Sequence, residues 1–287
     1  NNPMKAPYFL SSLQKDTNDI FGQVMVSGPQ AKEHALREKV ASQSYNNYLH
    51  EISKHHSIEV MDREIKSFLT AIPINGVICD IGGGWGWHWR NLYLVRPDVN
   101  VVIVDFCKSN LYHAKNILQD RVGKTIWLVH GDASQLEFES GTFNGYWSVQ
   151  TLQHIPNFEQ SVAEAVRVLM PGGIFASYSL NYSWPMAVVC NLLRRPYSTK
   201  KQIENTYYLN RAERKQGVTI GHLFNNHVTE RYSEILFKPG FCCHFPGKHR
   251  SWWGKLDALM SSDLPLFIWI ARQRSFHTKK PLEVVSY

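Results

Sequence analysis

The feature that most constrains the fold is an alternation of apolar runs and helix-like stretches between residues 57 and 180. Five runs have the length and composition of buried strands: residues 76–81, 99–106, 125–132, 145–151 and 173–180. Three stretches before and between them repeat apolar side chains at helical spacing: residues 57–72, 109–122 and 157–170. This alternation predicts an α/β fold whose parallel strands are joined by right-handed crossovers.

Polar side chains lie at the ends of four of these strand-like runs. They are Asp80, Asp105, Asp132 and Gln150. In open sheets of parallel strands, ligands bind in the crevice outside the carboxyl ends of the strands. The four residues are therefore predicted to border one binding site.

A glycine-rich loop follows the first run directly, with Gly82, Gly83, Gly84 and Gly86 in five positions. Without a Cβ, the backbone turns sharply and approaches a ligand closely, and the N–H groups that open a following helix bind anions. A tight turn without a ligand is the plainer alternative. A dinucleotide motif GxGxxG counted from Gly82 would place its third glycine at Trp87, whose ring argues against NAD or FAD. A Walker loop is excluded because no Gly-Lys-Ser/Thr follows.

The segment DIGGGWG, from Asp80 to Gly86, fits the pattern DxGxGxG and resembles the first motif of the class I S-adenosylmethionine-dependent methyltransferases. Four later stretches resemble motifs of that family in the same order: VVIVDF, GDAS, FNGYWSVQTLQHI and RVLMPGGIFASYSL. The resemblance covers residues 57–180, and this segment is similar to the small-molecule, type-11-like branch of the family. Asn144 departs from the family's usual aspartate, at a position that is usually structural.

The resemblance implies S-adenosylmethionine as cofactor and S-adenosylhomocysteine as product. It implies that the Asp105 carboxylate accepts hydrogen bonds from both ribose hydroxyls, and that Asp132 and the Ala133 N–H hold the adenine. Asp80 is expected to fix the loop more than to contact the ligand. The implied cofactor-binding residues are Asp80, Gly82, Gly84, Gly86, Asp105, Phe106, Asp132, Ala133 and Gln150. Trp85, Trp87 and Trp89 either wall the cofactor or, as we expect, pack under the helix that follows the loop.

His154 is the candidate catalytic residue, because it follows the fourth run near the expected position of the methyl group and would serve as a general base toward a hydroxyl acceptor. Its alternative role is to pack the turn before Pro156. Four later histidines, His222, His227, His244 and His249, are further candidates among which the sequence does not choose. No HExxH or comparable spacing occurs, so no metal site is expected.

The resemblance further implies a Rossmann-like, doubly wound, mostly parallel seven-stranded sheet with an antiparallel edge strand. It divides the chain into a helical N-terminal lid segment (1–56), the cofactor-binding core (57–180), a substrate cap insertion (181–226), the end of the core sheet (227–275) and a tail (276–287). Tyr45 and Tyr48 of the lid either reach the cofactor or pack. Residues 227–241 are expected to form the last helix and to run into a strand, and residues 263–273 the final strand.

Composition bounds the setting of the protein. The 287 residues carry a formal net charge of +7, which reflects either a solvated face or attraction to an acidic substrate, an anionic lipid surface or nucleic acid. The five cysteines form no CxxC pair, and neither a secretion signal nor a membrane span is apparent, so a reduced, cytoplasmic protein is expected. The segment WPMAVVCNLLRR is amphipathic enough to contact a lipid tail or to pack on the sheet.

These observations predict an enzyme that methylates a small molecule, whose acceptor is acidic, glycosylated or lipid-like. The Asn/Asp-Pro-Pro-Tyr signature of enzymes that methylate amino groups of bases and glutamine is absent. An RNA or DNA methyltransferase, suggested by the charge, and a non-catalytic cofactor-binding module are the alternatives. Peripheral membrane contact stays open, as does nucleic acid as a partner.

Overall fold

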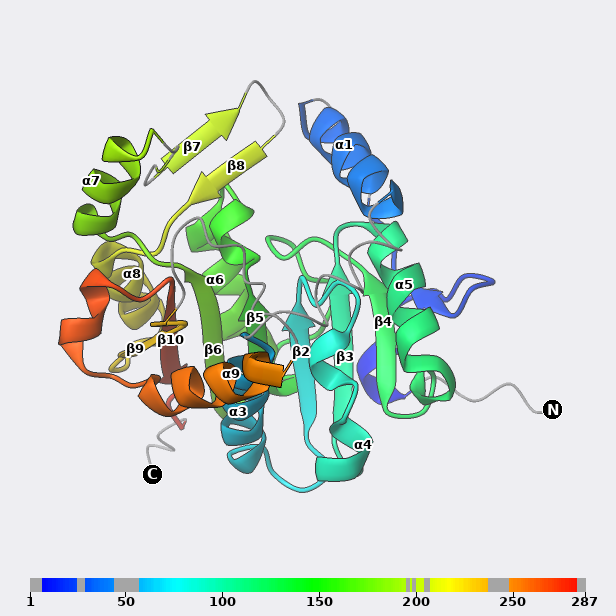
Figure 1. Cartoon of the computed structure of the whole chain (residues 1–287). Helices are drawn as coiled ribbons and strands as arrows, with labels where there is room; N and C mark the ends of the chain where they lie inside the picture. The colour runs from blue at the N-terminus through cyan, green and yellow to red at the C-terminus, as the bar shows by residue number, and fades with distance from the viewer. Residues whose placement is uncertain are drawn as a thin grey trace.

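An eight-stranded sheet forms the middle layer of the computed structural model, which describes residues 7–24, 29–43, 57–194, 197, 200–203, 207–236 and 248–282 (Figure 1). The spatial order is β1-β4-β3-β2-β5-β6-β10-β9. The strands are β1 (Ile20–Phe21), β2 (Val77–Ile81), β3 (Asn100–Asp105), β4 (Ile126–His130), β5 (Phe143–Val149), β6 (Leu169–Leu180), β9 (Thr229–Ser233) and β10 (Gln273–Lys279). Neighbours from β1 to β6 are parallel, whereas β10 pairs antiparallel with both β6 and β9.

Helices cover both faces of the sheet, because each carries an apolar stripe that must be buried. On one face, α3 (Ser57–Thr70), α4 (Leu92–Val95) and α5 (Lys108–Leu118) share a core. On the other face the core includes α6 (Phe158–Val168) and α8 (Arg214–Phe224). The predicted α/β, doubly wound, mostly parallel fold with an antiparallel edge is confirmed.

Further elements stand outside these layers. α1 (Pro29–Gln43) packs on α5, and α9 (Lys248–Met260) packs on α3. After β6 the chain forms α7 (Trp184–Leu192) and the hairpin of β7 (Lys200–Ile203) and β8 (Tyr207–Asn210). α1 and this hairpin stand at the top of Figure 1. Within the described segments, no helix is long and apolar enough to cross a membrane.

The predicted number of seven strands is wrong by one. β1 pairs in parallel with β4 and adds an eighth strand at the sheet edge. Its two residues are too few to show the alternation of a strand in the sequence.

The C-terminal elements also differ from the prediction. Residues 229–233 form β9 where a helix was expected, and Pro265–Trp269 form a 3-10 helix, η5, where the final strand was expected. The true last strand, β10, runs from Gln273 into the predicted tail. Charged residues made these strands hard to recognise in the sequence. Arg274 of β10 is buried and forms an ion pair with Glu230 of β9. Conversely, η5 is apolar although it lies at the surface, and its composition resembles that of a buried strand.

The predicted domain boundaries stay predictions. Residues 181–226 include α7, the hairpin and α8, and α8 returns to pack on α6 and β10. Within residues 1–56, α1 is helical, as expected of the lid segment, and β1 joins the sheet. Tyr45 and Tyr48 lie outside the described residues.

Candidate active site

The glycine loop after β2 is pressed against the end of β5. A Cβ added to Gly82, whose φ is 67°, would lie 2.0 Å from Oγ1 of Thr151, a distance that real Cβ contacts do not show. Gly84, with a φ of 53°, has more room: the nearest atoms to such a Cβ are Oδ2 of Asp105 at 3.7 Å and the Gly82 oxygen at 3.8 Å. The loop is therefore tightly packed beside Thr151, whereas a Cβ at Gly84 would make ordinary van der Waals contacts on the side of Asp105.

Asp105, at the end of β3, is held by three donors. Its Oδ2 accepts from the Gly84 N–H at 3.0 Å, and its Oδ1 accepts from the Cys107 N–H at 2.8 Å and from Nδ2 of Asn110 at 3.1 Å. Burial raises the pKa of this carboxyl, and the three hydrogen bonds counteract part of that rise. The bond to Gly84 joins the ends of β2 and β3, so two predicted site residues lie in direct contact.

Asp80 is buried beneath the loop, with 1% of its surface exposed. Its Oδ2 accepts a hydrogen bond from Nε1 of Trp89 at 2.6 Å and lies against Gly83, where an added Cβ would meet it at 2.1 Å. Burial raises the pKa of Asp80 to about 7; the Trp89 bond opposes this rise and the charge of Asp105 adds to it. This position fits the expected role of fixing the loop.

The tryptophans of the loop mainly pack. Gly86, with a φ of 68°, precedes η2 (Trp87–Trp89). Trp89 is fully buried, and Trp85 is buried with its Nε1 donating to Oδ1 of Asn110 at 3.0 Å. Trp85 thus supports the residue that holds Asp105.

Asp132 and Ala133 form a tight turn after β4. Oδ1 of Asp132 accepts from both the backbone N–H and the hydroxyl of Ser134, each at 2.8 Å. The turn begins beside Asp105, whose carbonyl oxygen accepts from the Gly131 N–H at 3.1 Å. The predicted adenine-binding turn therefore adjoins the predicted ribose-binding carboxylate.

Gln150 and His154 lie at the end of β5. Gln150 has a φ of 57°, and its side chain accepts from Nε2 of Gln153 at 2.9 Å and donates to Oε1 of Gln273 at 3.1 Å. His154 closes the 3-10 turn η4 (Leu152–His154), half-buried, with its Nε2 3.2 Å from Nε2 of Gln153. This glutamine chain was not foreseen, because Gln273 is more than a hundred residues from Gln150 in sequence.

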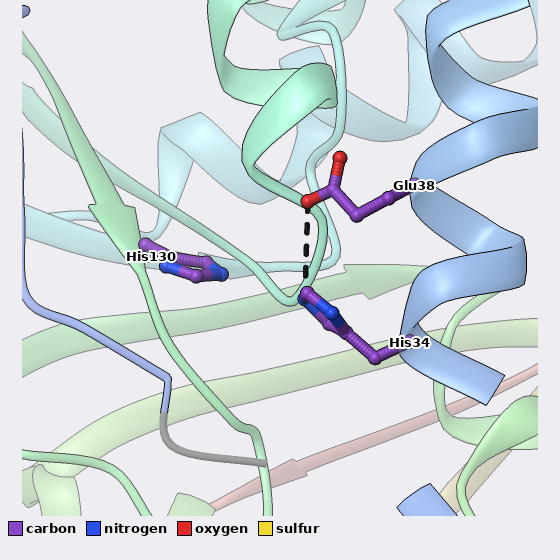
Figure 2. Close-up of side chains that lie close together, drawn as sticks. All are labelled: His34, Glu38 and His130. Carbon is purple, nitrogen blue, oxygen red and sulfur yellow. Dashed lines mark ion pairs between the residues drawn. The ribbon is translucent and has the colours of Figure 1, made fainter. Parts of the chain in front are cut away.

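Phe106 connects the site to α1 through His34, which Figure 2 shows with Glu38 and His130. Its carbonyl oxygen accepts from Nε2 of His34 at 3.0 Å and from Nε2 of His130 at 3.1 Å. Nδ1 of His130 accepts from the Val24 N–H at 3.4 Å, which assigns the ring proton to Nε2. Because His34 and Phe106 also stack edge to face, with ring centroids 4.8 Å apart, α1 is fixed to the residue next to Asp105.

Glu38, one turn after His34, caps the start of α5. Its carboxylate accepts from the N–H groups of Lys108 and Ser109 and from the Ser109 hydroxyl. Ligand atoms of His34, Glu38 and His130 lie within 4.8 Å of one another, a combination that transition metals bind. Each of the three is already engaged in hydrogen bonds within the chain, and we treat them as a clasp, the α1 clasp, which joins α1 to β3, β4 and α5.

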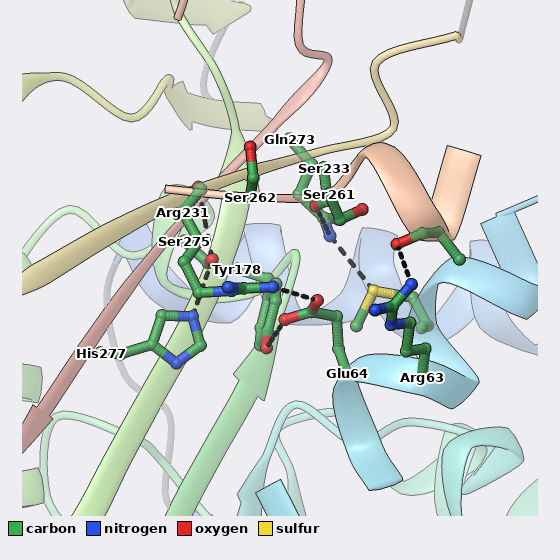
Figure 3. Close-up of polar contacts among 12 residues, drawn as sticks. Arg63, Glu64, Tyr178, Arg231, Ser233, Ser261, Ser262, Gln273, Ser275 and His277 are labelled. Atoms are coloured by element: carbon green, nitrogen blue, oxygen red, sulfur yellow. Dashed lines mark hydrogen bonds and ion pairs between the residues drawn. The ribbon is translucent and has the colours of Figure 1, made fainter. Parts of the chain in front are cut away.

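A second polar cluster lies where α3 meets β6, β9 and β10 (Figure 3). Glu64 accepts from the Tyr178 hydroxyl at 2.8 Å and pairs with Arg231 at 3.0 Å. Burial lowers the pKa of the neighbouring His277 to about 4, so this ring is neutral at physiological pH. Gln273 joins this region to Gln150 and also donates to Ser233 at 3.1 Å. The cluster anchors the two antiparallel strands beside the site.

The two described candidates among the remaining histidines are not brought to the site. His222 is exposed in the last turn of α8 and His227 is exposed just before β9, away from the strand ends that carry Asp80 and Asp105. His244 and the side chain of His249 lie outside the described part of the chain.

Comparison with known proteins assigns the centre of the chain. Residues 79–177 match a family model described as a methyltransferase domain. The chain is 32% identical over 99 residues to the ubiquinone/menaquinone biosynthesis C-methyltransferase UbiE of Methylobacterium nodulans, covering 34% of this chain and 39% of that protein. It is 30% identical over 117 residues to the sterol 24-C-methyltransferase of Kluyveromyces lactis, covering 39% and 30%. The matches thus span about a third of the length of these curated relatives.

Solved structures share the fold more widely than the sequence. A methyltransferase structure from Thermotoga maritima aligns with a TM-score of 0.58 over 84% of this chain and 99% of its own, at 13% identity. This likeness extends the common architecture beyond residues 79–177 and concerns the fold alone.

Proposed function

We propose that this chain, which contains a class I methyltransferase domain, transfers a methyl group from S-adenosylmethionine to a small-molecule acceptor. The observation that carries the proposal is the hydrogen bond between Gly84 and Asp105 at the ends of neighbouring parallel strands, beside which we place the cofactor. It lies inside the segment that matches the methyltransferase family model, in agreement with the motifs.

The residues around the Gly84–Asp105 contact fit the cofactor. Asp105 is held by backbone and amide donors, so its carboxylate is already oriented to accept ribose hydroxyls. Asp132 and Ala133 stand at the next strand end, where we place the adenine. When bound, S-adenosylmethionine supplies a methyl group activated by a cationic sulfur. The buried Asp80 carboxylate lies under the loop, where its negative charge would favour a cationic ligand.

The protein's contribution to the reaction is mainly position. Methyl transfer is an in-line displacement, so orienting the acceptor supplies a large part of the rate. Gln150 and Gln153 fix the turn that carries His154. We assign His154 the role of general base where the acceptor is a hydroxyl, and that of positioning residue otherwise.

We propose an apolar, lipid-like acceptor within the small-molecule class. The matched relatives are named for quinones and sterols. The segment that follows β6, where this chain would cover its acceptor, is rich in apolar residues. An acidic or glycosylated acceptor is the alternative, and a panel that pairs an isoprenoid quinone precursor and a sterol with a polar amine separates them.

The test begins with calorimetric titration by S-adenosylhomocysteine, with NAD as the control ligand. We expect micromolar or tighter binding that Asp105→Asn and Asp105→Ala weaken by at least about tenfold, since hydrogen bonds to a charged group are lost. The matched control is Asp120→Ala, which removes an exposed carboxylate in the 3-10 turn after α5. A folded protein that binds NAD, or neither ligand, would refute the cofactor assignment, and binding without turnover on any acceptor would favour a non-catalytic module.

A further inference from the structure

Two short elements present an apolar surface beyond the cofactor site. On α7, Trp184, Val188 and Leu192 recur every four residues on one helical face and are 58%, 49% and 78% exposed. On η5, Leu266 and Trp269 are 60% and 47% exposed. The rings of Trp184 and Trp269 lie 6.0 Å apart, so the elements form one surface, which we call the α7–η5 patch and define by these five residues with Ile270.

Hydrogen bonds from two buried polar side chains connect the two elements of this patch. Asn181, with 1% exposed, donates from Nδ2 to the carbonyl oxygens of Ile268 and Ala271 at 2.8 and 3.0 Å. Ser183, with 2% exposed, donates to the Trp269 carbonyl oxygen and caps α7 at Met186. These hydrogen bonds connect the start of α7 to the backbone of η5 and of the residues that follow it. The large apolar side chains of both elements stay exposed and do not enter a core.

Charge around the patch favours a partner with negative charge. Residues 181–203 contain no acid but include Arg194, Arg195, Lys200 and Lys201. Arg194 lies two residues after the end of α7 and is exposed. Near η5 the acid Asp263 is the exception. An apolar surface with tryptophans, followed along the chain by a basic segment, matches the boundary of an anionic bilayer, where apolar groups enter the acyl region and cations meet the headgroups. A second copy of the chain would bring like charges together.

We propose that the α7–η5 patch docks on the surface of an anionic lipid membrane. α7 has nine residues and lies on such a surface rather than crossing it. The segment starts at Asn181, directly after β6, so a docked patch would place the acceptor side of the sheet near the lipid. This docking does not require methyl transfer, and it would give the proposed lipid-like acceptor a short path to the site.

The experiment is co-sedimentation of the full chain with phosphatidylcholine vesicles, with and without phosphatidylglycerol. We expect binding to the anionic vesicles that weakens with salt. Leu192→Asp on α7 and, independently, Leu266→Asp on η5 should lower the bound-to-free ratio by about tenfold or more. The matched control is Leu94→Asp, which changes a leucine that is 68% exposed on α4 and should leave binding within about twofold. Arg194→Glu should lower binding to anionic vesicles alone.

Three outcomes would overturn the proposal. The first is a wild-type chain that binds neither kind of vesicle. The second is an equal loss of vesicle binding in Leu94→Asp and Leu192→Asp, which would show that the added negative charge alone weakens binding. The third is concentration-dependent dimerisation, without vesicle binding, that Leu192→Asp abolishes, because the patch would then be an interface between copies. Titration of each preparation with S-adenosylhomocysteine keeps a failure of docking separate from a failure of the methyltransferase proposal.

Discussion

At the scale of single residues, Asp80 shows how burial controls charge beside the glycine loop. Its carboxylate contacts Gly83 and Trp89 and lies under the loop rather than in water. Since burial raises its pKa to about 7, the residue is mostly protonated in mildly acidic solution and ionised above neutrality. The same burial that fixes the loop therefore makes its stability depend on pH.

We predict that Asp80→Asn stabilises the protein at pH 8 relative to the wild type, and less so at pH 5. The folded pKa of about 7 exceeds the ordinary aspartate pKa of 3.8, so the stabilising contribution of protonated Asp80 is complete below about pH 4 and is lost as pH rises to about 7. Between pH 5 and 8 the gap in unfolding free energy should grow by about 2 kcal/mol. Melting temperatures at the two pH values measure it.

The exposed Asp120→Asn variant serves as the control for Asp80, because its side chain is 80% exposed. A difference for Asp80→Asn that stays constant with pH would show that Asp80 does not titrate in this range.

The site residues differ in how far the sequence reveals them. Asp80 and Asp105 end apolar runs, and the parallel sheet brings such ends together. The partners that orient them are less visible: Asn110 supports Asp105 from within a helix, and Gln273 reaches Gln150 from the far end of the chain. No local pattern encodes those contacts, since they depend on tertiary packing.

At the scale of elements, the α1 clasp links a peripheral helix to the start of α5. Glu38 accepts from two backbone N–H groups that the helix leaves without intrahelical partners. Its negative charge at the N-terminus of α5 also complements the helix dipole. α5 carries Asn110, which holds Asp105, so the clasp supports the site through one helix.

We predict that Glu38→Ala lowers the unfolding free energy by about 1 kcal/mol, the usual cost of losing a helix cap. The amides of Lys108 and Ser109 should exchange with deuterium faster in the variant. Lys39→Ala, the next residue on α1 and an exposed one, is the matched control. Unchanged protection of both amides would contradict the assignment of Glu38 as the cap of α5.

The pair of Arg231 and Glu64 anchors β9 to α3. Glu64 has 5% of its side chain exposed, so Arg231→Met would leave a buried carboxylate that keeps, within the described part of the chain, the Tyr178 hydroxyl as its hydrogen-bond donor. We predict a loss of about 3 kcal/mol in unfolding free energy, measured in urea. The double variant with Glu64→Gln should recover most of that loss, because it removes the buried charge.

Lys124→Met is the matched control for this pair. It breaks an ion pair with Asp120 in which both side chains are exposed, and should lower the unfolding free energy by less than about 0.5 kcal/mol. If Arg231→Met costs no more than this control, the Arg231–Glu64 pair does not anchor β9.

Such pairs also explain which elements the sequence reveals. β3 is apolar from Val101 to Val104 and predictable, because both faces of the sheet are covered by helices there. β9 and β10 bury charged and hydrogen-bonded residues, so their sequences resemble surface segments. η5 shows the reverse, as an apolar run with exposed side chains whose sequence alone resembles that of a buried strand.

At the scale of the whole molecule, one sheet connects every part of the site and its supports. The core on the α6 and α8 face runs without interruption from Phe9 and Trp127, beside β1 and β4, to Phe276 on β10. Cofactor-binding candidates from β2, β3 and β4 therefore share a core with the antiparallel strands at the opposite edge. A ligand bound at the glycine loop stabilises this entire layer, because it binds only the folded chain.

We therefore predict a single thermal transition that S-adenosylhomocysteine shifts upward as a unit. At a hundredfold excess over its Kd, the ligand adds about 2.7 kcal/mol, which corresponds to roughly 5–10 °C for a chain of this size. Calorimetry and far-ultraviolet circular dichroism should give the same midpoint, and NAD should leave it unchanged. Asp105→Ala should abolish most of the shift while retaining one transition. Two resolved transitions, with the ligand moving only one, would instead mean that β9 and β10 unfold separately from the cofactor-binding strands.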